Sequence, residues 1–191
     1  EVIAEAYESR FNVKHFPAII SMQYGIATTK PISSLADVKG LKLRALGVYG
    51  EFAQALGASA TVVPGAELYT ALQSGVVDGA ENNPPSFFTS RHYEVCKFYS
   101  INEHTMVPDV LIISTQVWKR LNEQEKKWLS DAVEASVAVE RKYWAESEEE
   151  SLRKVKEAGV TISYPDKDPF EEKVQKIYEG YKNDEEIFSL I

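Results

Sequence analysis

Long hydrophobic runs and an excess of positive charge are both missing from this 191-residue chain. No stretch of about 18 apolar residues occurs, so the sequence predicts no membrane-spanning helix. The formal net charge is −8. So acidic a surface argues against binding of nucleic acid and against docking on anionic lipid, because both need basic patches. The first ten residues, Glu1 to Arg10, show neither the basic nor the apolar segment of a signal peptide.

Cysteine is nearly absent as well. Cys96 is the only one, which excludes an internal disulfide, and we interpret it as a small buried side chain on a strand. The patterns of catalytic sites are also missing. His15, His92 and His104 lie far apart, with no second metal-type ligand three or four residues away. No glycine-rich phosphate loop, nucleophile elbow or cysteine pair occurs. We therefore expect no catalytic residue, no metal site and no cofactor.

A compact alternation of short strands and helices is present in the first half of the chain. Strands are predicted at 41–46, 61–63 and 76–81, and they are separated by helices at 49–56 and 66–74. Strands separated by single helices indicate βαβ units and a parallel sheet. The pair Pro84–Pro85 then ends the pattern, since proline continues neither a strand nor a helix. A helix at 86–95 and strands at 98–103 and 110–114 are predicted to follow.

A long helix is predicted for the second half. Asn122 and Glu125 have the spacing of a capping box, and the helical pattern continues to Ala158, before a possible cap at Gly159. About 36 residues span roughly 54 Å, so we expect this helix to brace more than one lobe. The alternative is two helices that meet near Ser147. One face is predicted to be buried, with Trp128, Leu129, Ala132, Val133, Ser136, Val139, Tyr143 and Trp144. A strand at 160–164 and a helix at 170–181 complete the pattern.

Two polar residues stand at predicted strand ends, where open parallel sheets bind their ligands. Arg44 closes LKLRAL and Asn82 closes VVDGAEN. An arginine in an apolar strand costs free energy unless it is paired, and its planar fork fits a carboxylate. The sequence leaves two interpretations open for Arg44, a ligand site or a structural salt bridge to Glu67 or Asp78.

The neighbours of Arg44 and Asn82 also have two interpretations each. Asn82 is either a ligand contact or a turn residue before the prolines. The Glu81 carboxylate either accepts ligand hydroxyls or serves as a partner for Arg44. The large aromatic side chains nearby are predicted to be core residues, namely Tyr49, Tyr69, Phe87 and Phe88.

Two longer runs carry a family resemblance. KPISSLADVKGLKLRALG, followed by LGASATVVPGAELYTALQSGVVDGAENNPPSFFTSRHYEV, resembles the most characteristic stretch of the solute receptors of TRAP transporters, the DctP-like family. The likeness is close over residues 28–115 and looser to the C-terminus. It implies a non-catalytic periplasmic receptor that closes on a small organic acid and delivers it to the membrane permease.

The resemblance also implies a fold class and a domain organisation. The expected fold is α/β, a two-lobed periplasmic-binding-protein-like fold with βαβ units, a parallel-type sheet and a long domain-spanning helix. Residues 1–27 would be a remnant of the first lobe and the crossover, 28–105 the second, ligand-binding lobe, and 106–191 the return to the first lobe. The first lobe is expected to be incomplete, because such receptors begin with further residues that form much of it.

The ligand site is implied residue by residue. Arg44 matches the arginine that binds the ligand carboxylate in this family, and Asn82 matches the asparagine that hydrogen-bonds the ligand. Glu81 and Asn83, in the same block, are assigned to the ligand site with them. The region where members carry a second ligand arginine holds Gly25–Ala27 in this chain.

The block AENNPPSFFTSRHYEVCKFYSINEHT resembles a subgroup that includes receptors for hexuronic acids such as glucuronate and galacturonate. Pro84 stands where that subgroup carries tryptophan. A sugar acid is therefore the favoured ligand. Two alternative functions are a ligand-sensing domain coupled to signalling and a small-molecule enzyme on a doubly wound sheet, for which Glu81 would be the only candidate base.

Overall fold

The computed structural model describes residue 8, residues 11–180 and residues 182–183. The chain divides into two compact units. Unit 1 comprises Glu1–Met22 and Met106–Ser147, and unit 2 comprises Gln23–Thr105 and Glu148–Ile191. Most of the first ten residues, at the start of the predicted 1–27 segment, lie outside the described residues.

Unit 2 is built on a six-stranded sheet with one strand reversed. β3 pairs in parallel with β4 and β5, β6 pairs in parallel with β8, and β2 is antiparallel to both β5 and β6. Five strands therefore run in one direction, as the βαβ pattern predicts, and β2 makes the sheet mixed. In spatial order the strands are β4 (Ser59–Thr61), β3 (Lys42–Arg44), β5 (Gly79–Asn82), β2 (Gly25–Thr28), β6 (Phe98–Ser100) and β8 (Thr161–Ser163).

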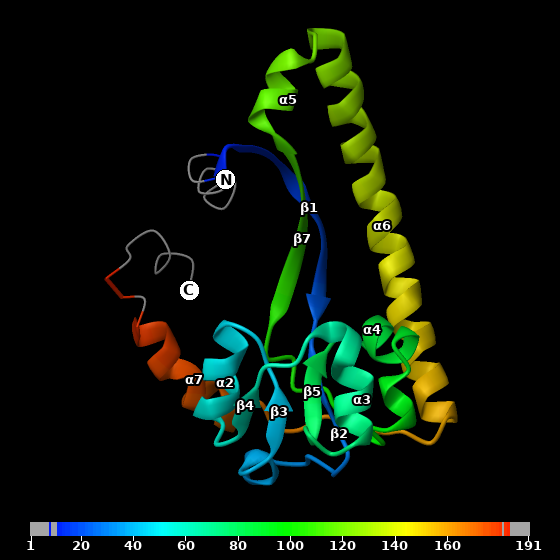
Figure 1. Ribbon diagram of the computed structural model, residues 1–191. Helices are drawn as coiled ribbons and strands as arrows, with labels where there is room; N and C mark the ends of the chain where they lie inside the picture. The colour runs from blue at the N-terminus through cyan, green and yellow to red at the C-terminus, as the bar shows by residue number, and fades with distance from the viewer. Residues whose placement is uncertain (1–7, 9–10, 181, 184–191) are drawn as a thin grey trace. The chain divides into compact units, whose positions relative to one another are not determined.

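Helices cover both faces of this sheet, so that alternate residues of a strand enter different cores (Figure 1). Ile26 of β2 belongs to the core under α2 (Val48–Ala55) and α7 (Asp168–Gly180), together with Leu43, Ala53, Leu56, Phe170 and Val174. Ala27 belongs to the opposite core, with Leu72 of α3 (Leu68–Gln73), Phe87 of α4 (Pro84–Thr89), Tyr99 and Val155. A sheet buried on both faces explains why its strands are rich in apolar residues.

The reversed strand β2 fits between its neighbours because of two glycines. A Cβ atom on Gly79 would lie 2.4 Å from the Ala27 carbonyl oxygen, and one on Gly25 would lie 2.6 Å from the Ser100 oxygen. Both distances are far below van der Waals contact, so a side chain at either position would force the strands apart.

The described part of unit 1 contains a two-stranded sheet of β1 (Val13–Gln23) and β7 (Met106–Ser114), followed by α5 (Thr115–Arg120). The Thr115 amide and hydroxyl both donate to the Asn12 carbonyl oxygen, at 3.0 and 2.9 Å. Phe16, which is buried, meets the Trp118 ring edge to face at 5.9 Å between centroids. These contacts fix α5 to the end of the strand pair.

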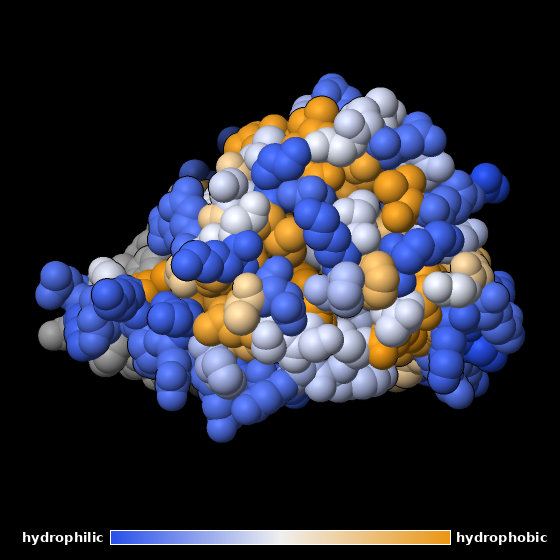
Figure 2. Space-filling view, turned by 90° about the horizontal axis from the view of Figure 1, so that it is seen from below, coloured by the Kyte–Doolittle hydropathy of each residue, from blue (hydrophilic) through white to orange (hydrophobic). Residues whose placement is uncertain are grey.

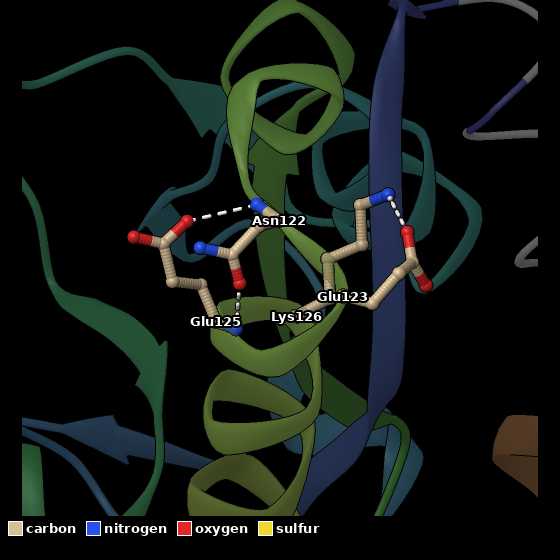
Figure 3. A network of polar contacts seen from close by, with 4 residues as sticks. All are labelled: Asn122, Glu123, Glu125 and Lys126. Atoms are coloured by element: carbon tan, nitrogen blue, oxygen red, sulfur yellow. Dashed lines mark hydrogen bonds and ion pairs between the residues drawn. The ribbon is translucent and has the colours of Figure 1, made fainter.

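The predicted long helix is confirmed as α6 (Glu123–Glu157), 35 residues without a break. The Asn122 amide donates to Glu125 Oε2 at 2.8 Å, and the Glu125 amide donates to Asn122 Oδ1 at 2.9 Å, so the predicted capping box is present (Figure 3). Gly159, with φ of +86°, follows the helix as predicted. The alternative of two helices meeting near Ser147 is excluded, and α6 contributes residues to both units.

Three expectations from the sequence differ from the structure. Residues 148–191, predicted to return to the first lobe, belong to unit 2, because β8 completes its sheet and α7 enters its core. The predicted strand at 61–63 is found two residues earlier, as β4. The helix predicted at 86–95 begins at Pro84 and ends at Thr89, as α4.

The predicted buried face of α6 is only partly covered by the described residues. Val133 is buried, but Trp128, Val139 and Tyr143 are 63%, 53% and 62% exposed. Exposed apolar side chains also occur on unit 2, among them Val62 and Val76, and Figure 2 shows hydrophobic patches among hydrophilic residues on the face drawn there. Some apolar side chains of α6 are therefore not covered by any of the described residues.

Candidate functional site

Arg44 and Asn82 occupy the positions that the sequence predicts. Arg44 is the last residue of β3 and Asn82 the last of β5, and these strands are parallel neighbours. Their carboxyl ends therefore lie at the same edge of the sheet. Gly25, at the start of β2, pairs with Asn82 and brings the reversed strand to this edge as well.

The Arg44 side chain is held on one side and open on the other. It is 15% exposed, and its Nε donates to the Val63 carbonyl oxygen at 3.1 Å. Its Nη1 lies 4.0 Å from Glu81 Oε1, an ion pair without a hydrogen bond. The terminal nitrogens make no hydrogen bond to any residue that the structure describes. Neither predicted structural partner is used, since Asp78 instead accepts from the Lys42 amide at 2.8 Å.

Glu81 is the acidic group nearest to this guanidinium. Its side chain is 11% exposed. Burial raises the pKa of the Glu81 carboxyl, and the charge of Arg44 partly offsets that effect. Oε2 is fully shielded and has no hydrogen-bond partner within the described chain. Of the two interpretations from the sequence, the contact with Arg44 is therefore present, and the second carboxylate oxygen is buried without a partner among the described residues.

Asn82 is fixed through its backbone and its amide oxygen. The Tyr99 hydroxyl donates to the Asn82 carbonyl oxygen at 2.8 Å, and the Asn83 amide donates to Asn82 Oδ1 at 2.9 Å. The side-chain NH2 of Asn82 has no partner among residues 11–180. A donor group is thus oriented at the same edge as Arg44.

Asn83, which the sequence places in the ligand site, has a different position. Its side chain is buried, and its Oδ1 accepts from the Ser86 amide at 2.9 Å as the N-cap of α4. Pro84 and Pro85 occupy the first turn, where the missing amide hydrogens cost nothing. This arrangement favours a structural role for Asn83, because an Asx cap competes with ligand binding for the same oxygen.

His104 is a feature that the sequence analysis did not select. Its Nδ1 lies 2.9 Å from Asn102 Oδ1, and because an amide oxygen only accepts, Nδ1 carries the proton. The ring stacks on Phe52 at 4.4 Å between centroids. Burial lowers the pKa of His104 to about 4, so the ring is neutral at pH 7. The histidine lies in the INEHT segment after β6, but nothing local in the sequence indicates the stacking partner.

Two adjoining cavities lie beside this histidine in unit 2. One, of about 150 Å³, is mostly apolar and is lined by Val48, Tyr49, Phe52, His104, Thr105, Val174, Ile177 and Tyr178. The second, of about 230 Å³, shares Phe52, His104, Val174 and Tyr178. Charged side chains line the second cavity as well, and the one cation among its described lining residues, Lys167, is paired with Glu103.

Other reactive groups are either buried or dispersed. Burial, with a contribution from the charge of Arg44, lowers the pKa of His92. Cys96 is fully buried, as predicted, but it precedes β6 by two residues and does not lie on a strand. Burial raises the pKa of its thiol to about 12. Within the described part of the chain, no three His, Cys, Asp or Glu side chains are grouped to hold a metal ion. None of the helices described there combines the length and hydropathy needed to cross a membrane.

Comparisons with known proteins agree on one family. Bacterial extracellular solute-binding protein, family 7, matches residues 21–184. A solute-binding protein of Chromohalobacter salexigens is 36% identical over 168 residues, which are 86% of this chain and 50% of that protein. The chain thus spans about half the length of the curated relatives it matches.

Solved structures match over nearly the whole chain. A TRAP periplasmic solute-binding protein from Bradyrhizobium, in complex with α/β-D-galacturonate, has a TM-score of 0.90 at 38% identity, covering 100% of this chain and 65% of that one. Another from Chromohalobacter salexigens, with bound D-glucuronate, has a TM-score of 0.93 at 32% identity, covering 99% and 65%. These likenesses agree with the predicted α/β receptor fold.

Proposed function

The chain belongs to family 7 of the bacterial extracellular solute-binding proteins, and on that premise we propose that it forms the ligand-recognising part of a TRAP transporter receptor for a sugar acid. The receptor would work in the periplasm and deliver its ligand to the membrane permease of the transporter. We assign it no catalytic step. The relatives are described as binding proteins, and the edge of the sheet in unit 2 presents groups suited to binding.

The observation that carries the proposal is the state of Arg44. A guanidinium held through Nε, with its terminal nitrogens free of hydrogen bonds to described residues, is preorganised for a bidentate carboxylate. It stands at the carboxyl end of a parallel strand, the edge at which open α/β sheets bind ligands. The NH2 of Asn82 supplies a neutral donor at the same edge.

The choice of a hexuronate is supported by the number and kind of these groups. A hexuronate has one carboxylate and several hydroxyls, which correspond to one guanidinium, one amide donor and one carboxylate acceptor. Two similar receptors were solved with galacturonate and glucuronate bound. We therefore expect a hexuronate to place its carboxylate on Arg44 and its hydroxyls near Asn82 and Glu81.

The test is titration calorimetry of the purified protein with D-galacturonate, D-glucuronate and the neutral sugars D-galactose and D-glucose. Each neutral sugar is a matched control, because it differs from the acid only in carrying a hydroxymethyl group in place of the carboxylate. At least one hexuronate should bind, and its neutral counterpart should bind roughly 30-fold more weakly or worse, given about 2–5 kcal/mol for a buried charged contact. Equal affinity for an acid and its neutral sugar, or no binding of either acid, would contradict the proposal.

A further inference from the structure

A groove lies at the open edge of the six-stranded sheet, between β8 and the C-terminal end of α6. Its volume is about 630 Å³, larger than either cavity beside His104. The lining comes from the last turns of α6 and from β8 with its flanking residues, namely Leu152, Arg153, Lys156, Val160, Thr161, Ile162 and Tyr164. All of these residues belong to unit 2, so this β8 groove is a feature of that unit alone.

The β8 groove combines an apolar floor with an open strand edge. Val160 is buried, and Leu152 and Ile162 pack partly buried against the same core. Among the described strands β8 is outermost and pairs only with β6, through the backbone of Thr161 and Ser163. Alternate residues of a strand direct their backbone groups to opposite sides, so the amide and carbonyl of Ile162 face the open edge. An extended segment beside β8 would find backbone groups to pair with and an apolar surface to cover.

The charge of this groove is opposite to that of the chain as a whole. The chain has a net charge of −8, whereas the described lining holds the cations Arg153 and Lys156 and no carboxylate. Arg153 pairs with Glu150 and Glu157, but all three side chains are exposed, and such ion pairs contribute little. Lys156 is exposed and forms no ion pair with any described residue. Both cations are therefore accessible to a carboxylate from another molecule.

The other side chains of the groove indicate what kind of molecule carries that carboxylate. Tyr164 lines the groove and is 72% exposed, and tyrosine is enriched where proteins contact one another. A small free anion would leave the apolar floor and the strand edge uncovered. An anionic membrane is disfavoured, because the chain as a whole would be repelled by it. An acidic peptide segment matches the cations, the apolar floor and the strand edge together.

We propose that the β8 groove binds an extended acidic segment of a partner protein. A segment alongside β8 presents every second side chain to the face that α6 covers. Apolar side chains of the segment lie on Leu152 and Ile162, and the carboxylates that alternate with them pair with Arg153 and Lys156. Because the edge of β8 is short, side-chain contacts and charge supply most of the affinity. This inference does not depend on the sugar-acid site at Arg44.

The probe is the peptide acetyl-TVTETVTE-amide, in which valine and glutamate alternate on one face of the extended chain, and its control is acetyl-TVTQTVTQ-amide. In calorimetry the glutamate peptide should bind with a Kd below about 1 mM, and about tenfold more tightly than the glutamine peptide. The double variant Arg153→Gln, Lys156→Gln should lose about that factor. Lys173→Gln with Lys176→Gln is the matched control, because these exposed lysines lie on α7, at the other face of the sheet.

Several results would overturn the proposal. These are equal affinity for the two peptides, equal losses in the two double variants, and no binding of the glutamate peptide at about 1 mM. Binding of phosphatidylglycerol vesicles without binding of the peptide would assign the groove to a membrane surface instead. Displacement of the peptide by an equal concentration of succinate would reduce the groove to a simple anion site. D-Galacturonate affinity should be the same in both double variants, so failure at this groove is distinguishable from failure at Arg44.

Discussion

Replacing Arg44 by alanine removes two contacts that the structure defines. The Val63 carbonyl oxygen loses the donor at 3.1 Å, and Glu81 loses the positive charge 4.0 Å from its Oε1. The lost hydrogen bond should cost about 1 kcal/mol of the free energy of unfolding. Glu81 should then take up a proton more readily, because neutralisation avoids an isolated buried charge. The fold should therefore survive the change.

The effect on ligand affinity should be much larger. Truncating one partner of a buried charged contact costs about 2–5 kcal/mol, which at about 1.4 kcal/mol for each factor of ten is roughly 30- to 4,000-fold in Kd. Arg44→Lys should fall between alanine and the unchanged protein, because an ammonium keeps the charge but not the planar fork. The difference between the two variants measures the geometric part of recognition.

The assay combines titration calorimetry with a hexuronate and urea unfolding of each variant. Arg153→Ala is the control for the loss of one positive charge, since the described partners of Arg153 are carboxylates of its own helix, Glu150 and Glu157. The reasoning would be refuted by an Arg44→Ala variant that binds within threefold of the unchanged protein. A variant that binds weakly only because it has unfolded would be recognised in the urea curve.

Four further outcomes are expected. Burial lowers the folded-state pKa of His104 to about 4, so the unfolded chain binds more protons than the folded chain as the pH falls toward 5. The free energy of unfolding should therefore fall on the order of 2 kcal/mol from pH 7 to pH 5. In urea unfolding, the His104→Gln variant should show a smaller fall. Asn122→Ala should lower stability in thermal unfolding by about 1 kcal/mol, because the cap of α6 is lost. Gly79→Ala should cost about 1–3 kcal/mol in urea unfolding, because its Cβ would meet the Ala27 oxygen. As an isolated polypeptide, the 191-residue chain should self-associate in sedimentation, since Trp128 and Tyr143 are exposed.

Each of these outcomes can be contradicted by a specific result. An unchanged pH profile in the histidine variant would show that another group carries the acid sensitivity. Asn122→Ser should be nearly neutral, and equal losses for serine and alanine would refute a capping role. Full stability of the Gly79 variant would mean that β2 can move away. A monomer at every concentration would show that the exposed side chains of α6 are tolerated in water.

The order of the helices and strands could be predicted from the sequence because each element has a local pattern of residues. The glycines after helices, the capping box and the alternation of strands and helices all act over a few residues. Exact strand limits depend on pairing instead. Thr61 to Val63 has the composition of a strand, but pairing with β3 ends where Thr61 meets Arg44, and Val62 is then 76% exposed. Similarly, β8 has too few residues to indicate which unit it joins.

The candidate site was predictable to the extent that it depends on strand ends. Arg44 and Asn82 stand out because a polar residue closes an apolar strand, and the parallel pairing of β3 and β5 brings them to one edge. The lack of a partner for Glu81 Oε2 could not be predicted, because it depends on where the tertiary fold places all the surrounding side chains. The stacking of His104 on Phe52 joins segments 52 residues apart and depends equally on the tertiary fold.

The two sheets differ in how much backbone they leave for further pairing. The outer strands of the large sheet, β4 and β8, are three residues each, and so short an edge offers only one or two outward hydrogen-bonding positions. β1 and β7, with 11 and nine residues, are the two members of a two-stranded sheet, so each has one long side unpaired among the described residues. About half the residues of a strand direct their amide and carbonyl groups to a given side. An added strand from any source would therefore gain several times more backbone hydrogen bonds beside β1 or β7 than beside the sheet that carries Arg44.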